Sequence, residues 1–404
     1  MIEKPNAPFP GLRQFAADFG PVYMASGLVA FVFSVTGPLA ILLSVGAQGG
    51  LSESDMASWI FGSFFINGLI SIVFCLLYRE PLVFLWTIPG AVLVGPALGH
   101  LSFPEVIGAY LTCGALMLVL GLSGLVRRCM EAVPMPIVMA MVAGVFLRFG
   151  TGLVNAVHND LWVAAPMVLA FIVLSASPAF GRRMPPLIGA LIVGGCCVLL
   201  LGKFKTDSAT LFHLASPNLY APAFSWQAIV ELVVPLAITV LVVQNGQGFA
   251  VLGAAGHKPP INAITAACGA GSLVSACIGS VSTCLTGPVN AILVGTGEKA
   301  GHYTAGVVVG VLALGFGLMS PFFTRLLLGT PAAFIAALGG LAMLRVLQTA
   351  FSAAFGAGRF TLGALVTFLV TVADVTIFNI GAAFWGLVIG FATSWLIERR
   401  DFVR

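Results

Sequence analysis

The sequence predicts an all-α polytopic membrane protein with fourteen transmembrane segments, arranged as two inverted repeats of seven. Hydrophobic residues make up 59% of the 404 residues, charged residues only 8%, and the mean hydropathy is +1.07. A soluble domain would be about 25% charged. Apolar runs long enough to span a bilayer recur from end to end. In addition, each half of the chain holds one short apolar segment that Pro and Gly interrupt.

The two interrupted segments predict a binding site. The first has Thr87 before Pro89-Gly90, and the second has Thr286 before Gly287-Pro288. Proline disfavours helix just before it, so we expect extended chain up to each Thr and a half-helix after it. Extended backbone within a membrane must be hydrogen-bonded, most simply by pairing of the two stretches. Such matched breaks are typical of transporter binding sites, although Pro and Gly can also merely kink packed helices.

The fourteen expected segments follow the apolar runs. They lie near residues 22–47, 56–78, 84–99, 103–126, 134–150, 161–179, 185–202, 225–253, 260–277, 283–297, 301–322, 330–352, 360–373 and 375–396. The polar stretches 154–160 and 203–226 are expected to be loops. Residues 1–20 lack the apolar core of a cleavable signal and are expected to form a cytoplasmic N-terminal segment.

The basic residues support this count. With both termini in the cytoplasm, fourteen Lys and Arg residues fall inside and four fall outside, as the positive-inside rule requires. The inside set is Lys4, Arg13, Arg79, Arg127, Arg128, Arg182, Arg183, Lys258, Lys299, Arg345, Arg359, Arg399, Arg400 and Arg404, and the outside set is Arg148, Lys203, Lys205 and Arg325. Omitting either short segment would place every later loop on the opposite side of the membrane and remove the excess of basic residues inside. The charges therefore favour both short segments crossing an inner membrane.

Seven segments per half make the repeats inverted, because an odd number brings the second half into the membrane from the other side. The first repeat covers 21–202, a connecting loop covers 203–224, and the second repeat covers 225–397. Segment 3 then corresponds to segment 10.

Segment 8 carries the amides Gln244, Asn245 and Gln247, followed by Gly248 and Phe249. Three amides are expensive against lipid, so they should face the protein interior. Gln244 and Gln247 share a helix face, and amides can donate hydrogen bonds to a carboxylate. Interhelical hydrogen bonding is the alternative role.

The opposite wall of the pocket is expected in segment 1, at Ser34-Val35-Thr36-Gly37-Pro38, where Thr36 offers a hydroxyl. An ordinary helix kink explains this stretch nearly as well. Phe33, Trp86 and Phe249 are candidate aromatic walls, each of which could equally be a packing residue.

The half-helix N-termini, with free N–H groups and positive dipole ends, predict an anion site. None of the 14 acidic residues lies in the middle of segments 1, 3, 8 or 10. Glu231 and Asp374 are the nearest intramembrane-edge acids, so either is a candidate proton relay or an interfacial charge. The five histidines fall in loops or segment ends and are expected to be solvated. The cysteines lie mostly inside apolar segments and are expected to be small buried residues. No catalytic motif, cofactor site or metal site is recognisable, so we do not expect an enzyme.

The chain resembles the benzoate–proton symporters. The likeness rests on residues 244–252, on Ala255-Gly256 and Pro259-Pro260, on the two Pro/Gly breaks and on chain length. The breaks are shared with nucleobase–cation symporters and sulfate-type anion transporters. The resemblance implies a core domain (21–126 plus 225–322) and a gate domain (134–202 plus 328–397). It also implies substrate between segments 3 and 10, alternating access of the elevator type and often a homodimer.

One departure from the wider group bears on the substrate. Nucleobase members use an acid in segment 8 to bind the base, and this chain has Gln244 and Asn245 there. We therefore expect a secondary transporter that imports benzoate or a related aromatic carboxylate with a proton. The alternatives are an inorganic anion carrier of the sulfate or bicarbonate type and an anion channel. Proton coupling would rest on the substrate itself or on a remote acid such as Asp374.

Overall fold

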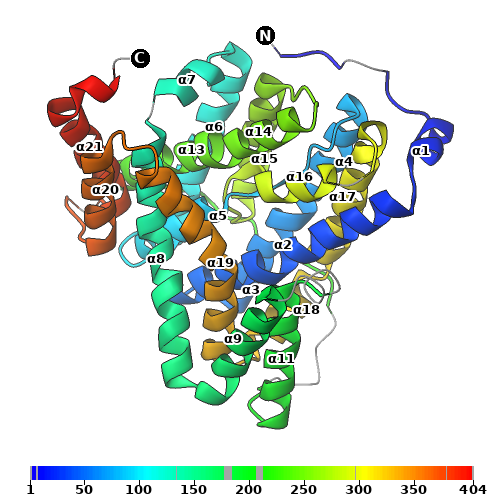
Figure 1. The fold of residues 1–404 in the computed structure, drawn as a ribbon, viewed down its shortest axis with the longest axis horizontal. Helices are drawn as coiled ribbons and strands as arrows, with labels where there is room; N and C mark the ends of the chain where they lie inside the picture. The colour runs from blue at the N-terminus through cyan, green and yellow to red at the C-terminus, as the bar shows by residue number, and fades with distance from the viewer. Residues whose placement is uncertain are drawn as a thin grey trace.

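The structure is a computed structural model that describes residues 2–5, 8–132, 134–176, 184–205, 213–295, 297–378 and 380–402. Arg182, Arg183 and Arg404 of the expected cytoplasmic charges lie outside the described residues. The described chain is largely helical, and its two short strands lie in the middle of the molecule (Figure 1).

The first half of the chain runs from an N-terminal helix through the first strand to α11. Its elements are α1 (Leu12–Asp18), α2 (Pro21–Gln48), α3 (Glu53–Phe61), the π-helical turn η1 (Gly62–Ile66), α4 (Asn67–Tyr78), β1 (Phe84–Trp86), α5 (Ile88–Ala97), α6 (Phe103–Ser123), α7 (Val126–Ala132), α8 (Met135–Asn159), α9 (Leu161–Ala176) and α11 (Pro186–Leu200).

The second half repeats this order of a long helix, a strand and a short helix. Its elements are α12 (Trp226–Ala228), η3 (Ile229–Val233), α13 (Val234–Ile238), η4 (Thr239–Asn245), α14 (Gly246–Ala254), α15 (Ile261–Cys277), β2 (Thr283–Leu285), α16 (Gly287–Val294), η5 (Lys299–Gly301), α17 (His302–Leu318), α18 (Ser320–Leu328), α19 (Ala332–Phe355), α20 (Thr361–Ala373), α21 (Ala382–Ile397) and η6 (Arg399–Phe402).

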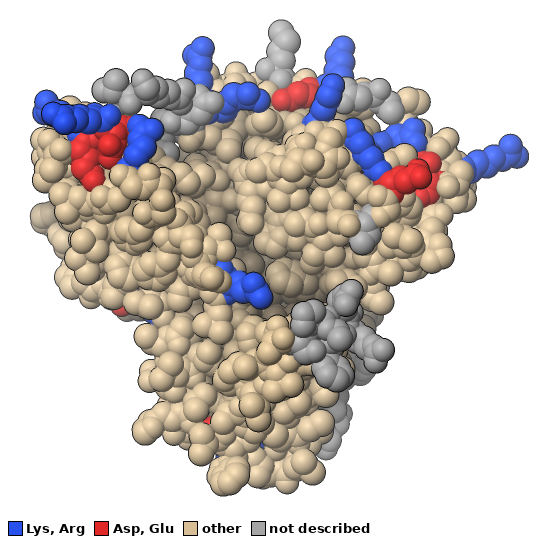
Figure 2. Space-filling view, viewed as in Figure 1, with Lys and Arg blue, Asp and Glu red and all other residues tan. Residues whose placement is uncertain are grey.

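Seven helical runs among the described residues are long and apolar enough to cross a membrane, and the protein is an integral membrane protein. The runs are Pro21–Gln48, Glu53–Tyr78, Phe103–Ser123, Met135–Asn159, Trp226–Ala254, Lys299–Leu318 and Ala332–Phe355. Six further apolar helices have 10–17 residues, among them α5. On the face in Figure 2, basic side chains gather mostly at the end where both termini lie in Figure 1.

Several expected boundaries were wrong. The stretch 154–160, expected to be a loop, is helical to Asn159 because α8 continues well beyond residue 150. The expected segment 301–322 is two helices, α17 and α18, and α21 begins at Ala382 rather than near 375. The Pro/Gly break expected in segment 1 does not interrupt the helix, since α2 continues through Pro38.

Two arginines that the charge count placed at the two sides of the membrane, Arg148 and Arg345, lie inside long helices. Arg148 is the fourteenth residue of α8, which has 25 residues, and Arg345 is the fourteenth of α19, which has 24. The charge count alone therefore did not reveal that these two arginines lie at mid-helix.

The helices pack around the paired strands in a consistent pattern. The most extensive contacts join α8 with α19, α6 with α15, α20 with α21, α9 with α11, and α4 with α17. Helix α2 contacts both half-helices, α5 and α16, and also packs against α19. This arrangement encloses β1 and β2, whose residues are all buried.

Candidate functional site

The two strands form a two-stranded antiparallel ribbon, which confirms that the extended stretches pair. Phe84 lies opposite Leu285, Leu85 opposite Cys284, and Trp86 opposite Thr283. The ribbon is extended at each end by one further hydrogen bond. The amide of Thr87 donates to the Ser282 carbonyl, and the amide of Thr286 donates to the Val83 carbonyl, each at 3.1 Å.

The outer edges of the ribbon are satisfied by side chains from neighbouring helices. The Phe84 amide donates to the Ser71 hydroxyl (2.8 Å), and the Thr283 amide donates to the Ser272 hydroxyl (3.0 Å). Ser71 and Ser272 lie on the helices that precede the two strands, α4 and α15. Edge groups left open in a buried ribbon would each cost several kcal/mol, so these serines allow extended chain to exist here.

Two asparagines bind the ribbon in the same way. The Leu285 amide donates to Oδ1 of Asn245 (2.8 Å), and the Val83 amide donates to Oδ1 of Asn290 (3.1 Å). Asn290 also donates through Nδ2 to the Thr286 carbonyl (2.8 Å). The carboxamide oxygen of Asn245 is therefore bonded to β2. Asn245 thus has a structural hydrogen-bonding role, which was the alternative to ligand binding.

The N-terminus of half-helix α5 is capped by the side chain of Thr87. The Thr87 hydroxyl accepts a hydrogen bond from the Gly90 amide and lies 3.2 Å from the Thr239 hydroxyl, to which it donates. Pro89 has no N–H to offer. Because Thr87 caps the helix, the α5 N-terminus has little donor capacity left for a ligand.

The N-terminus of half-helix α16 is open by comparison. The Thr286 side chain makes no capping hydrogen bond. Within the described part of the chain, the amides of Gly287 and Val289 have no acceptor, whereas the Asn290 amide donates to the Thr286 carbonyl (3.2 Å). Uncapped N–H groups and the positive end of the helix dipole together favour an anion.

The two glutamines of the segment 8 run lie beside this open N-terminus. A Cβ atom placed on Gly287 would lie 2.6 Å from Cγ of Gln247, so glycine allows the amide to approach the helix end. Gln247 is exposed and Gln244 is only 6% exposed. Neither side chain makes a hydrogen bond to any described residue, which leaves both amides available to a ligand.

A close contact also joins Gly248 to the ribbon. A Cβ atom on Gly248 would lie 2.7 Å from Cδ2 of Leu285, so α14 approaches β2 closely at this residue. Gln244 and Asn245 end a π-helical turn, η4, which precedes α14. Such turns often occur at functional sites because they redirect neighbouring side chains.

The predicted aromatic walls differ in their surroundings. Trp86 is buried, and its ring centroid lies 4.7 Å from that of Phe64, so it packs in the core. Phe249 is half-buried, and Phe33 is 39% exposed on α2. The Thr36 hydroxyl donates to the Phe33 carbonyl (3.1 Å), which occupies its proton.

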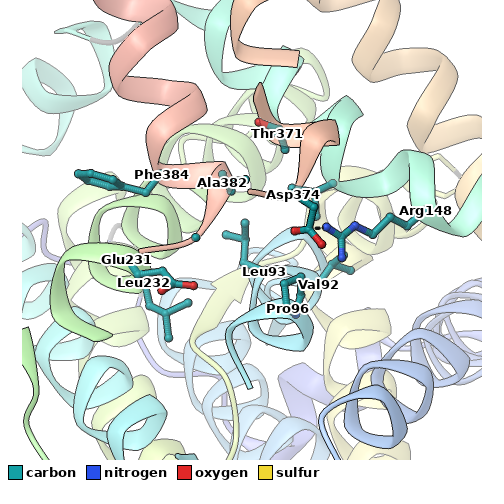
Figure 3. Close-up of a pocket in the computed structure, with 13 residues that line it drawn as sticks. Val92, Leu93, Pro96, Arg148, Glu231, Leu232, Thr371, Asp374, Ala382 and Phe384 are labelled. Carbon is teal, nitrogen blue, oxygen red and sulfur yellow. Dashed lines mark ion pairs between the residues drawn. The ribbon is translucent and has the colours of Figure 1, made fainter. Parts of the chain in front are cut away.

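Both candidate proton relays line one pocket, shown in Figure 3. The pocket lies between α5 and η3 on one side and α8, α20 and α21 on the other, and it encloses about 420 Å³ including the part open to solvent. Asp374 forms an ion pair with Arg148, and its side chain is 48% exposed. Glu231 is 6% exposed, and its Oε2 lies 2.8 Å from Nε2 of His100.

The expectation that all five histidines are solvated was wrong for three of them. His100 bonds Glu231, as described above. His257 and His302 are buried, and their rings share a hydrogen bond of 3.0 Å between Nε2 and Nδ1. Each lies at a helix end or in a loop, as predicted, but the loops fold back onto the protein. Two cysteines also differ from expectation, since Cys196 and Cys277 are exposed.

Sequence reasoning missed the residues that build the site without facing a ligand. Ser71, Ser272 and Asn290 satisfy the ribbon, and Thr239 bonds Thr87. The need to satisfy an unpaired strand edge was a usable signal, because the serines occur 13 and 11 residues before the strands they bond. His100 carried no signal, since its partner is 131 residues away.

The fold is similar to that of solved anion transporters. The transmembrane domain of a cyanobacterium bicarbonate transporter, BicA, matches with a TM-score of 0.63 at 14% identity, covering 94% of this chain and 98% of that one. SLC26A9 matches with a TM-score of 0.65 at 15% identity, covering 98% of this chain and 67% of that one. At these identities the likeness concerns the fold.

Sequence comparison gives the family. Inner membrane protein YdcO of Escherichia coli is 28% identical over 373 residues, which cover 92% of this chain and 94% of that protein. The benzoate membrane transport protein of Acinetobacter baylyi is 26% identical over 392 residues, covering 96% and 98%. The family model BenE, benzoate membrane transport protein, matches residues 17–396. The resemblance seen in the sequence is thereby confirmed, and the chain belongs to the BenE family of benzoate membrane transport proteins, which are transporters and not enzymes.

Proposed function

We propose that this protein is a secondary active transporter that imports benzoate or a related aromatic carboxylate together with a proton. The observation that carries this proposal is the open N-terminus of α16. There the Thr286 side chain leaves the first helical amides uncapped, and Gln247 lies against Gly287. Family membership and the name of the Acinetobacter relative support benzoate as the first substrate to test.

The geometry suits a carboxylate better than a cation or a neutral base. The α16 dipole presents positive potential, and amide N–H groups of Gln244 and Gln247 can donate to carboxylate oxygens. The Thr286 hydroxyl is available as a further donor. The aromatic ring would lie against Phe33 or Phe249, which both retain exposed surface.

Other predicted site residues act indirectly in this proposal. Thr87 caps α5, Pro89 and Gly90 lie in the first turn of that helix, and Asn245 holds β2. Trp86 and Thr36 support the walls. These residues would fix the position of the ligand groups, so changing them would affect binding through the ribbon.

The transport mechanism that we propose is alternating access of the elevator type in a protein of fourteen segments. The core domain (21–126 plus 225–322) would move against the gate domain (134–202 plus 328–397), with both termini in the cytoplasm and two copies forming a homodimer. The matched hydrogen bonds of Ser71 and Ser272, and of Thr87 and Thr286, support two inverted repeats related by a pseudo-two-fold axis through the ribbon.

For the proton we favour Glu231 over Asp374. Asp374 is half exposed, and its carboxylate forms an ion pair with Arg148. Glu231 is buried, bonds a titratable histidine, His100, and its Oε1 lies against the backbone of Gly381 at the start of α21. A carboxyl that joins a core helix to a gate helix can couple its protonation to their relative motion.

An inorganic anion carrier is the second candidate, favoured by the fold shared with BicA. An uptake competition distinguishes the two. Purified protein in proteoliposomes would take up labelled benzoate, with unlabelled benzoate, sulfate or bicarbonate as competitor. Inhibition by benzoate alone supports the aromatic carboxylate, and strong inhibition by bicarbonate or sulfate would overturn it. Flux that saturates at carrier rates argues against a channel.

A further inference from the structure

Arg345 is an arginine in the middle of an apolar helix. At 1.5 Å per residue it lies roughly 15–20 Å from either end of α19. Its side chain is exposed. In the part of the chain that the structure describes, its guanidinium has no acidic partner. An arginine at membrane depth is expensive unless it faces a water-filled cavity or a ligand, so this position calls for an explanation.

Arg345 lies one turn from a contact between α19 and α2. Ala342, three residues earlier and on the same face, touches α2 at Gly37, where a Cβ atom would clash with it. Phe33 lies four residues before Gly37 on α2 and is exposed. Both Phe33 and Arg345 are thus one helical turn from the point where the two helices cross.

The half-helix with the open N-terminus is close to this crossing. Helix α2 packs against α16 as well as against α19, so α16 and the helix that carries Arg345 contact the same helix. An α-helix is about 10 Å across, the Debye length is about 8 Å in physiological salt, and screening is weaker where protein and lipid exclude ions. We therefore expect the charge of Arg345 to act on an anion that approaches α16, which holds no charged side chain of its own.

Arg148 provides an internal comparison. It occupies the same position in α8, the fourteenth, also follows a leucine, and α8 packs along α19. Arg148 faces the pocket of Figure 3 and is paired with Asp374, as the dashed line marks. Of these two arginines, Arg345 is the one whose charge is available to an external anion in this structure.

We propose that Arg345 attracts the transported anion to the α16 N-terminus and makes the pathway selective for carboxylates over neutral aromatic molecules. This inference rests on the proposed function. Gln244, Gln247 and the helix dipole supply hydrogen bonds and partial charge, and Arg345 supplies the full positive charge that the predicted site lacks. Its position on the gate side lets its distance from the ligand change as core and gate move.

The test is benzoate binding to the purified full-length protein in detergent, at low and high salt. Arg345→Gln should weaken binding about tenfold at low salt and should remove most of the salt dependence. Arg345→Lys should restore most of the affinity, because it keeps the charge. Arg128→Gln, which removes an exposed arginine on α7, is the matched control and should bind as the wild type does.

The outcomes separate the inference from the proposed function. If wild-type protein binds benzoate and Arg345→Gln binds it equally well with the same salt dependence, the inference is wrong and the arginine only reaches toward lipid headgroups. If wild-type protein binds no benzoate, the proposed function fails and the inference fails with it. Comparable thermal unfolding of the three variants and the wild type shows that the differences arise at the site.

Discussion

Gln247 lies directly against Gly287, so close that a Cβ atom on the glycine would meet the glutamine side chain at 2.6–2.8 Å. This contact places a free carboxamide at the end of α16 whose first amides are uncapped. A neutral site of this kind can hold an anion without the cost of burying a charged side chain next to it. The contact also makes the site sensitive to a single added methyl group.

The first prediction concerns this pair. Gln247→Ala should weaken benzoate binding about 10- to 100-fold, since a hydrogen bond to a charged group contributes roughly 1.5–3 kcal/mol. Gly287→Ala should weaken it by displacing the amide. The double variant should be no weaker than the worse single variant, because both changes remove one interaction.

Equilibrium binding to purified protein measures all three variants. Gln227→Ala, on the same helical run and exposed, is the matched control. Fully additive losses in the double variant would contradict a shared role for the two residues.

The second prediction concerns Asn245, whose carboxamide accepts the Leu285 amide. Asn245→Leu should destabilise the protein by about 1–3 kcal/mol, because it leaves a buried strand N–H without a partner. Gln244→Leu, one residue earlier and without such a bond, should lower binding with little loss of stability. Thermal unfolding in detergent measures both, and equal stability losses would show that Asn245 does not hold the ribbon.

The third prediction concerns Glu231 and its hydrogen bond to His100. Glu231→Gln keeps the shape but cannot ionise, so benzoate exchange across the membrane should persist while accumulation driven by a proton gradient is lost. Asp374→Asn should retain accumulation. Exchange and gradient-driven uptake in proteoliposomes distinguish these effects. Normal accumulation by Glu231→Gln would show that the substrate or another group carries the coupled proton.

The fourth prediction concerns pH. Burial, with smaller contributions from His302 and Lys299, lowers the pKa of His257 from 6.5 to about 4. Between pH 6.5 and pH 4 the unfolded chain binds a proton at His257 that the folded chain excludes. The free energy of unfolding is therefore highest, as far as this group is concerned, above pH 6.5, and it decreases as the pH falls toward 4. Hydrogen exchange in residues 255–260, corrected for intrinsic rates, should be faster at pH 5 than at pH 7.

His257→Asn should reduce that difference, because it removes the titrating group. An exchange rate in 255–260 that is independent of pH in the wild type would contradict the buried pair of His257 and His302.

Much of this arrangement could be predicted because it depends on local chemistry. Pro89 and Pro288 each require a helix start and disfavour helix before it, so the positions of β1, β2 and the half-helices followed from the sequence. The amides of segment 8 stood out because polar groups are rare in apolar runs. Which of these amides is free to bind a ligand and which one is bonded to β2 could not be predicted, because it depends on how the helix packs against the strand.

What could not be predicted depends on residues far apart in the chain. The difference between the α5 and α16 N-termini arises from whether a threonine hydroxyl turns toward its own helix, and both segments contain that threonine. The pairing of His100 with Glu231 joins helix ends 131 residues apart. The charge count placed Arg345 on the cytoplasmic side. Its exposure in the middle of α19 could not be predicted, because it depends on how that helix packs.

The most direct test of the central claim is uptake of radiolabelled benzoate into proteoliposomes that contain the purified protein, with and without an inward proton gradient. The account predicts accumulation above the equilibrium level only when the gradient is present, and its loss when a protonophore is added. Uptake that is absent, or that proceeds to the same level without a gradient, would contradict proton-coupled import of an aromatic carboxylate.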